Sequence, residues 1–100
     1  MNVEYTRRAV ADLADIAANS RAAFGDGLAA ALERRFREII GQIEWDPGSA
    51  TPVKNRPGVH VVALVKYPFR LFYRIVATDD RVVILHIRST SRRTWKGEQR

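Results

Sequence analysis

The residues best suited to chemistry are arginines and a histidine in the second half of the chain. Arg70, Arg74 and Arg88 occur in stretches that alternate apolar and polar side chains, and His86 lies two residues before Arg88. Guanidinium groups pair with phosphates and carboxylates. Imidazole titrates close to neutral pH and can act as a general base. The sequence therefore indicates an anion-binding surface with His86 as its candidate base.

The charge of the chain is divided unevenly between its halves. The 100 residues include 17 lysines and arginines and 11 acidic residues, which gives a net charge of +6. Residues 51–100 carry eleven of the basic residues and only three of the acidic ones. The positive excess thus belongs to the segment that contains the candidate site. Such an asymmetry is typical of proteins that bind a polyanion or an acidic partner.

Several classes of protein are excluded by composition. The chain has no cysteine, which excludes disulfides and thiolate metal sites and favours a cytoplasmic location. No apolar run approaches the ~20 residues that span a bilayer, so no membrane contact is expected. The first residues show no secretory signal. No P-loop, paired-carboxylate site or metal-ligand cluster is visible, and we expect neither a cofactor nor a metal.

The basic side chains must be positioned by helices and strands. The sequence pattern predicts an α+β fold in one domain, residues 1–100, with a basic tail from about residue 89. Hydrophobic periodicity and turn residues predict the following elements in order: a strand at 2–5, a helix at 7–24 capped by Thr6 with Val10 and Phe24 on its apolar stripe, a helix at 28–44 capped by Asp26, a surface loop at 46–58, and strands at 59–66, 69–77 and 81–88. Two helices with so short a break form an antiparallel hairpin, and the last three strands form an antiparallel meander.

The alternation along the strands predicts which face the helical hairpin covers. Placing Arg70, Arg74 and Arg88 against the helices would bury charge, so the opposite face is expected to form the core. The expected core face consists of Leu71, Tyr73, Ile75, Val83, Leu85 and Ile87. The exposed face then combines the arginines with Phe72, Val76, Ile84 and His86, and also with Val62 and Leu64 of the preceding strand. Large apolar groups beside arginine are typical of an interaction surface.

Three stretches and the order of elements resemble the RelE/ParE superfamily of type II toxins. Residues 67–75 (YPFRLFYRI) are similar to the penultimate strand of that family, residues 81–88 (RVVILHIR) to its last strand, and residues 89–95 (STSRRTW) to its basic tail. The resemblance covers about residues 1–95. It implies a helical hairpin packed on a small, mainly antiparallel sheet, and a toxin neutralised by a cognate acidic antitoxin.

The resemblance implies two competing activities. RelE-like members cleave mRNA in the ribosome, and ParE-like members are associated with inhibition of DNA gyrase. Arg70 matches the family arginine on the penultimate strand, and Arg92 or Arg93 lies near the second family arginine. The lysines that RelE-like nucleases carry on the preceding strand correspond to Val61 and Ala63. This departure favours a ParE-like toxin.

We therefore predict a ParE-like toxin that arrests growth by binding a target such as gyrase. Its target- or antitoxin-binding residues are expected to be Arg70, Phe72, Arg74, Ile84, Arg88, Arg92, Arg93 and Trp95. The first alternative is an mRNA endoribonuclease that uses Arg70, Arg93 and His86 in place of the usual set. The second alternative is a nucleic-acid-binding module without toxicity.

Overall fold

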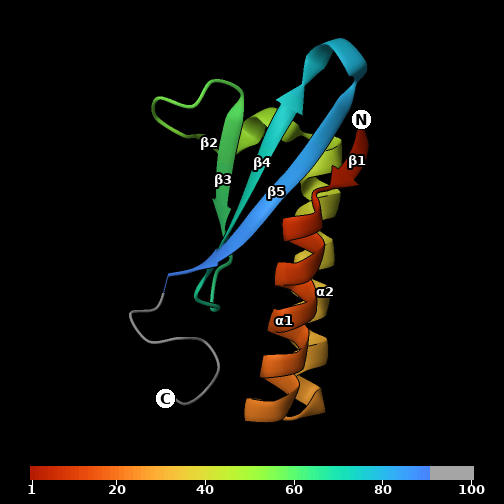
Figure 1. Cartoon of the computed structure of the whole chain (residues 1–100), viewed down its shortest axis with the longest axis vertical. Helices are drawn as coiled ribbons and strands as arrows, with labels where there is room; N and C mark the ends of the chain where they lie inside the picture. The colour runs from red at the N-terminus through yellow and green to blue at the C-terminus, as the bar shows by residue number, and fades with distance from the viewer. Residues whose placement is uncertain (91–100) are drawn as a thin grey trace.

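The computed structural model describes residues 1–90, which form a helical hairpin packed on one face of a five-stranded sheet (Figure 1). The elements are β1 (Asn2–Tyr5), α1 (Arg7–Phe24), α2 (Asp26–Trp45), the short 3-10 helix η1 (Pro47–Ser49), β2 (Thr51–Pro52), β3 (Val59–Ala63), β4 (Phe69–Val76), a second 3-10 helix η2 (Ala77–Asp79) and β5 (Arg81–Ser89). The strand order is β1-β5-β4-β3-β2. β1 pairs with β5 in parallel and the other pairs are antiparallel. The predicted α+β architecture is confirmed.

The two helices are joined at a single glycine. Thr6 caps α1 as predicted, because its hydroxyl oxygen accepts a hydrogen bond of 3.0 Å from the Ala9 amide. Gly25 ends α1 with a φ of 89°, a conformation that glycine adopts without a steric penalty. α2 begins immediately afterwards, two residues earlier than predicted. Asp26 was expected to cap this helix but is its first residue, and its carboxylate pairs instead with Arg21 at 3.3 Å.

The core lies between the helices and the facing side of β3, β4 and β5. α2 contributes most of the helical part through the buried Leu32, Phe36, Ile39 and Ile43. α1 contributes less than its sequence pattern suggested. Val10 and Phe24, both expected on its apolar stripe, are 56% and 49% exposed. These two positions are corrections to the predicted core. Leu64 and Val62 are corrections in the opposite direction, because they were expected on the exposed face but Leu64 belongs to the core and Val62 packs against it.

β5 contains an irregularity that changes which of its side chains face the helices. Phe72 of β4 lies opposite His86, but the next residue, Tyr73, lies opposite Ile84. Leu85 is therefore an extra residue, which is the definition of a β-bulge, and the alternation of side chains changes parity across it. The predicted core positions Val83 and Leu85 are wrong for this reason.

Because of this change in parity, the side chain of Ile84 faces the helices. It was expected on the exposed face as a binding residue, but it is 0% exposed and belongs to the core together with Val82. A side chain with no exposed surface cannot contact a partner in this structure. Ile84 is accordingly removed from the candidate binding residues.

α1 completes the edge of β5 where β1 ends. The Thr6 hydroxyl donates to the Leu85 carbonyl at 2.7 Å, and the Asp12 carboxylate accepts from the Ile87 amide at 3.0 Å. Both contacts fall on the bulged segment, whose backbone groups β1 does not reach. The bulge is thus fixed by side chains of the first turns of α1.

The segment after α2 is less irregular than predicted. Thr51 and Pro52 pair with Val61 and His60 and add a short edge strand to the sheet. The loop then returns to the sheet, and the Arg74 guanidinium donates to the Pro57 carbonyl at 3.0 Å. Within residues 1–90, no helix is long and apolar enough to cross a membrane.

Candidate functional site

The side of the sheet that faces away from the helices brings most of the predicted residues together. Strand register places Ala63, Arg70 and Arg88 in one row and Val61, Phe72 and His86 in the next, followed by a row of Val59, Arg74 and Val83. These nine residues are called the open face below, although Val59, which belongs to it by register, is itself buried. Residues directly opposite one another on neighbouring strands share a face. The predicted grouping of Arg70, Phe72, Arg74, His86 and Arg88 follows from this register.

The centre of the open face is a pair of stacked rings. The Phe72 and His86 rings lie 4.6 Å apart, centre to centre, with an angle of 22° between their planes. His86 Nδ1 is buried and finds no hydrogen-bond partner among residues 1–90. The imidazole therefore presents a flat, largely apolar surface beside the phenyl ring.

The surroundings of His86 favour its neutral form. Burial lowers the pKa of His86 below its ordinary value of 6.5, because a charged ring loses hydration there. Repulsion from Arg8, Arg56 and Arg88 lowers this pKa further, and Asp12 acts in the opposite direction. Three cations from α1, the loop before β3 and β5 thus surround one ring. Arg8 and Arg56 were missed by the sequence analysis, since only the tertiary fold brings them near β5.

The arginines of the open face are not neutralised by the protein's own acids. Within residues 1–90, no carboxylate lies within ion-pair distance of Arg70, Arg74 or Arg88. The ion pairs that form are on the helices or beside β1: Arg8–Asp12, Arg21–Asp26, Arg35–Glu38, Arg37–Glu33, and Arg81 with Glu4 and Asp79. The positive charge of the open face is therefore available to a partner.

The positions that distinguish the two predicted activities lie in the first two rows of the open face. Ala63 is directly opposite Arg70, and Val61 is directly opposite Phe72. Both positions carry small apolar side chains where RelE-like nucleases, by the resemblance above, carry lysines. The arrangement can bind an anion through guanidinium groups and an apolar group on Phe72. It supplies no ammonium group in either row.

Two residues with titratable rings belong to the helix-facing side. Tyr73 is 0% exposed and its hydroxyl donates to the Pro47 carbonyl, which confirms its predicted place in the core. Burial raises the pKa of Tyr73, and Asp46 adds to this effect against a hydrogen bond from the Ala50 backbone. The His60 ring stacks on the Tyr73 ring with 5.5 Å between centres. Neither residue reaches the open face.

Three of the expected site residues belong to the C-terminal tail. Arg92, Arg93 and Trp95 fall after residue 90, beyond the described part of the chain. Within residues 1–90, no group of three or more His, Cys, Asp or Glu side chains is arranged to hold a metal ion.

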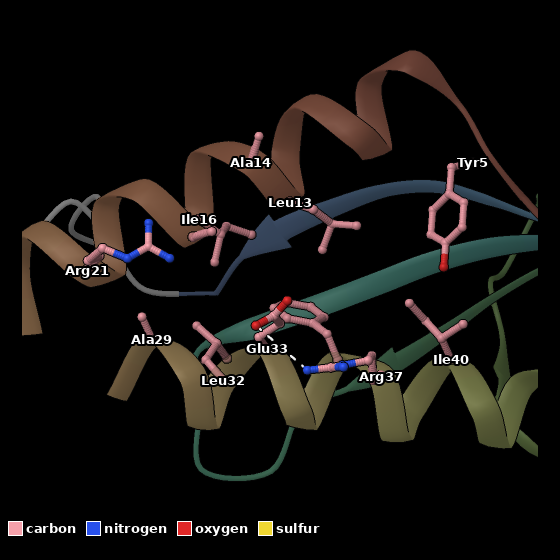
Figure 2. A pocket seen from close by; sticks show the side chains of 12 residues that line it. Tyr5, Leu13, Ala14, Ile16, Arg21, Ala29, Leu32, Glu33, Arg37 and Ile40 are labelled. Atoms are coloured by element: carbon pink, nitrogen blue, oxygen red, sulfur yellow. Dashed lines mark ion pairs between the residues drawn. The ribbon is translucent and has the colours of Figure 1, made fainter. Parts of the chain in front are cut away.

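A groove between α1 and α2 was not predicted (Figure 2). It has a volume of about 360 Å³. Its apolar lining includes Leu13, Ile16, Leu32, Phe36 and Ile40, with Tyr5, Arg21, Glu33 and Arg37 among the polar residues. Arg37 and Glu33 form an ion pair of 3.7 Å within it. An apolar lining with charged edges suits an amphipathic segment. Sequence periodicity could not show this groove, because its width depends on how far apart the helices pack.

The chain is similar to known proteins in both sequence and fold. Residues 3–94 match the family model described as the ParE toxin of the type II toxin–antitoxin system parDE. No curated protein sequence matches the chain significantly. Among solved structures, the chain is similar to one from the chromosomal ParDE system of P. aeruginosa. The TM-score is 0.76 and the identity 25%, over 91% of this chain and 97% of that one.

The fold is also shared with RelE toxins. The isolated E. coli RelE toxin gives a TM-score of 0.67 at 14% identity, over 91% of this chain and 85% of that one. A chain of the intact E. coli RelBE complex gives the same score and identity, over 91% and 98%. At this identity the likeness concerns the fold alone. The family model, in contrast, spans nearly all of the sequence, and the chain therefore belongs to the ParE family of toxins of type II toxin–antitoxin systems.

Proposed function

We propose that this toxin arrests growth by binding a cytoplasmic protein target, with DNA gyrase as the first candidate, and that it does not cleave RNA. The observation that carries this proposal is the row around Arg70. Ala63 lies directly opposite that arginine and Val61 directly opposite Phe72. The open face therefore resembles a recognition surface, with an apolar centre and a guanidinium rim.

The chemistry of RNA cleavage makes demands that the nine residues of the open face meet only in part. A metal-free nuclease needs a base for the 2′-hydroxyl, cations for the charge that develops on phosphorus, and an acid for the leaving oxygen. Arg70 and Arg88 are able to supply the cations. His86 is the one candidate base among the residues of the open face, and it is stacked against Phe72 with one ring nitrogen buried. No second proton donor stands beside it on that surface.

The same surface is proposed to bind a cognate acidic antitoxin. Arg70, Phe72, Arg74 and Arg88 would contact its acidic segment, together with Arg92, Arg93 and Trp95 of the tail. The unpaired state of the three described arginines supports this assignment, because an acidic partner would relieve their mutual repulsion. The apolar groove between α1 and α2 is suited to a helical part of the antitoxin. Structures from the P. aeruginosa ParDE and E. coli RelBE systems are similar to this chain.

The proposal is tested by two assays on the same purified protein. One measures inhibition of DNA supercoiling by gyrase, and the other measures ribosome-dependent mRNA cleavage. We expect inhibition without cleavage, and we expect Arg70→Ala to weaken the inhibition at least tenfold, since a buried charge-assisted contact is worth on the order of 2 kcal/mol. Arg37→Ala is the matched control, because Arg37 lies on α2 and is already paired with Glu33.

Two other outcomes would favour a different function, and a third would support the antitoxin assignment. Ribosome-dependent cleavage that is lost in both Arg70→Ala and His86→Ala would replace the proposal with an mRNA endoribonuclease. Duplex binding without growth arrest on induced expression would favour a nucleic-acid-binding module. Growth arrest that is reversed by co-expression of an acidic protein encoded next to the toxin gene would support the antitoxin assignment.

A further inference from the structure

A second concentration of unpaired positive charge lies away from the open face. A hollow of about 540 Å³ lies between α2 and the turn that joins β3 to β4. Its lining consists of Ala31, Arg34, Arg35, Glu38, Val65, Lys66 and Tyr67. Four of these seven side chains are charged, three of them positively. This composition differs from that of the groove between α1 and α2, whose lining is mainly apolar (Figure 2).

The hollow is assembled from two elements that are distant in sequence. Ala31, Arg34, Arg35 and Glu38 are spaced at three and four residues and so lie on one face of α2. The turn contributes the opposite wall and is held by hydrogen bonds from the Leu64 amide to the Phe69 carbonyl and from the Tyr67 amide to the Leu64 carbonyl. The two walls bring Lys66 to the same space as the α2 arginines.

Lys66 occupies a backbone conformation that lysine rarely adopts. Its φ is 80°, in the region that normally requires glycine or asparagine. Backbone strain of this kind often accompanies functional positions, where the side chain is needed despite the cost. A glycine at position 66 would fit the turn better and would remove the charge. The presence of lysine there is a second observation, independent of the hollow, that directs attention to this site.

The charges in the hollow are only partly balanced. Arg35 pairs with Glu38 at 3.1 Å, and its side chain is 29% exposed, so it is held in a defined position. Arg34 and Lys66 are exposed, and within residues 1–90 no carboxylate lies within ion-pair distance of either. The hollow therefore offers two free cations and a third that competes between Glu38 and any incoming anion.

The turn that forms one wall of the hollow also joins the two strands at the Arg70 end of the open face. Ala63, the last residue of β3 before this turn, is directly opposite Arg70, which is directly opposite Arg88. The end of β5 reaches the same turn, because the Thr90 amide donates to the Pro68 carbonyl at 2.8 Å. Figure 1 shows the β3–β4 turn and the end of β5 at the same, lower end of the sheet.

We infer that this hollow binds the phosphate backbone of double-stranded DNA through Arg34, Arg35 and Lys66, called the basic band below. Three cations on the two walls of one hollow suit a partner whose negative charges repeat at regular intervals. Val65 and Tyr67 also line the hollow, so an acidic peptide with apolar anchors is the competing occupant that the test has to exclude. On this view the toxin contacts DNA in addition to its protein target.

The inference is tested by fluorescence anisotropy of a labelled duplex of about 20 base pairs, titrated with the full-length chain at several salt concentrations between about 50 and about 200 mM. Arg34→Gln and Lys66→Asn should each weaken binding and reduce the slope of log K against log salt by about 0.9. Asparagine is chosen at position 66 because it tolerates the positive φ. Arg37→Gln, on the groove side of the same helix, should change the slope little.

Glu38→Gln is the most discriminating variant, because it should strengthen DNA binding. Releasing Arg35 makes a third cation of the hollow available to phosphate, and we expect the affinity to rise on the order of threefold. Glu33→Gln is its matched control. It removes the same charge from the same helix and frees Arg37 in the same way, but on the groove side. An equal gain in both variants would mean that net charge alone governs binding, and the inference would be wrong.

Two further results would overturn the inference that the hollow binds DNA. Absence of salt-dependent duplex binding at low salt would overturn the inference. So would preferential binding of an acidic peptide with the same dependence on Arg34 and Lys66, which would make the hollow a protein-binding site. Thermal melts of each variant identify any loss that comes from unfolding. Since bare duplex is used, failure here leaves gyrase inhibition untouched, and failure of gyrase inhibition leaves this result standing.

Discussion

The two faces of the sheet are formed by the same strands but have opposite properties. On the helix-facing side, Leu71, Tyr73 and Ile84 have no exposed surface. On the open face, Arg70 and Arg88 are exposed and lie beside one another in the strand register. Alternation along a strand allows one side to stabilise the fold while the other recognises a partner. Stability and binding can therefore be changed almost independently in this protein.

The distribution of ion pairs follows the same division. Several arginines of the helices are matched by acids one turn away, as in Arg37–Glu33 and Arg35–Glu38, although Arg34 has no such partner in the described part of the chain. No acid within residues 1–90 pairs with the arginines of the open face. Like charges on one surface repel one another and destabilise the free protein slightly. A partner that neutralises them removes this repulsion, which is one reason for a toxin of this kind to remain bound to an acidic antitoxin.

The largest expected effect tests which side chains of β5 face the helices. Ile84→Ala should lower the free energy of unfolding by about 2–5 kcal/mol, because it leaves a cavity in the core. Val83→Ala, one residue away on the open face, should cost about 1 kcal/mol or less. Urea denaturation followed by circular dichroism measures both. A larger loss for Val83→Ala would mean that β5 alternates without a bulge.

This bulge also marks the limit of what the sequence could predict. Alternation identified every strand of the meander and the correct core face of β4, because Phe69 to Ile75 keep a strict period of two. It failed in β5 because either parity places apolar residues inside: Val83 and Leu85, or Val82 and Ile84. A bulge leaves no clear signal in such a uniformly apolar strand. The decisive contacts come from Thr6 on α1 and its hydrogen bond to β5.

The candidate site was predicted where it depends on one strand and missed where it depends on several. Arg70, Phe72 and Arg74 share a face by local alternation, and their grouping needed no tertiary information. Arg8 and Arg56 come near His86 only because α1 and the loop before β3 pack around β5. The helical groove and the hollow beside Lys66 likewise depend on distances between elements. Hydrophobic pattern specifies which face is buried but not how far apart two helices lie.

The second expected effect concerns the contact that fixes the bulge. Asp12→Ala removes the acceptor of the Ile87 amide and leaves that backbone group without its partner. The cost should be about 1–3 kcal/mol of unfolding free energy. Asp15→Ala is the matched control on the same helix, because Asp15 is exposed and should change stability little. If the two variants are equally stable, the bulge is held by other contacts.

The third prediction separates binding from stability. The double variant with Arg70→Gln and Arg88→Gln should unfold within about 0.5 kcal/mol of the original protein, since neither guanidinium has an acidic partner within residues 1–90. It should nevertheless lose target inhibition and antitoxin affinity. Arg81→Gln should do the reverse, because Arg81, one row beyond the open face on the same side of the sheet, pairs with Glu4 at 2.7 Å and with Asp79 at 3.3 Å. Its urea midpoint should fall while inhibition is retained. Loss of inhibition in Arg81→Gln at full stability would contradict this division.

The smallest effect is a dependence of stability on pH that originates in the open face. Burial and the nearby Arg8, Arg56 and Arg88 lower the pKa of His86 below 6.5, with Asp12 opposing them. As the pH falls below about 6.5, the unfolded chain therefore takes up a proton that the folded chain resists, and stability decreases. The contribution is fully present above pH 6.5 and is lost toward the lower pKa of the folded state.

The variant His86→Phe should remove this part of the acid sensitivity, because phenylalanine keeps an aromatic ring opposite Phe72 but has no proton to gain. The difference in unfolding free energy between the two proteins should be small at pH 7.5 and should shift in favour of the variant at pH 5. An NMR titration of the His86 ring provides the independent check. A pKa at or above 6.5 would show that a nearby carboxylate outweighs the surrounding arginines, and the open face would then be less positive than its ion-pair pattern indicates.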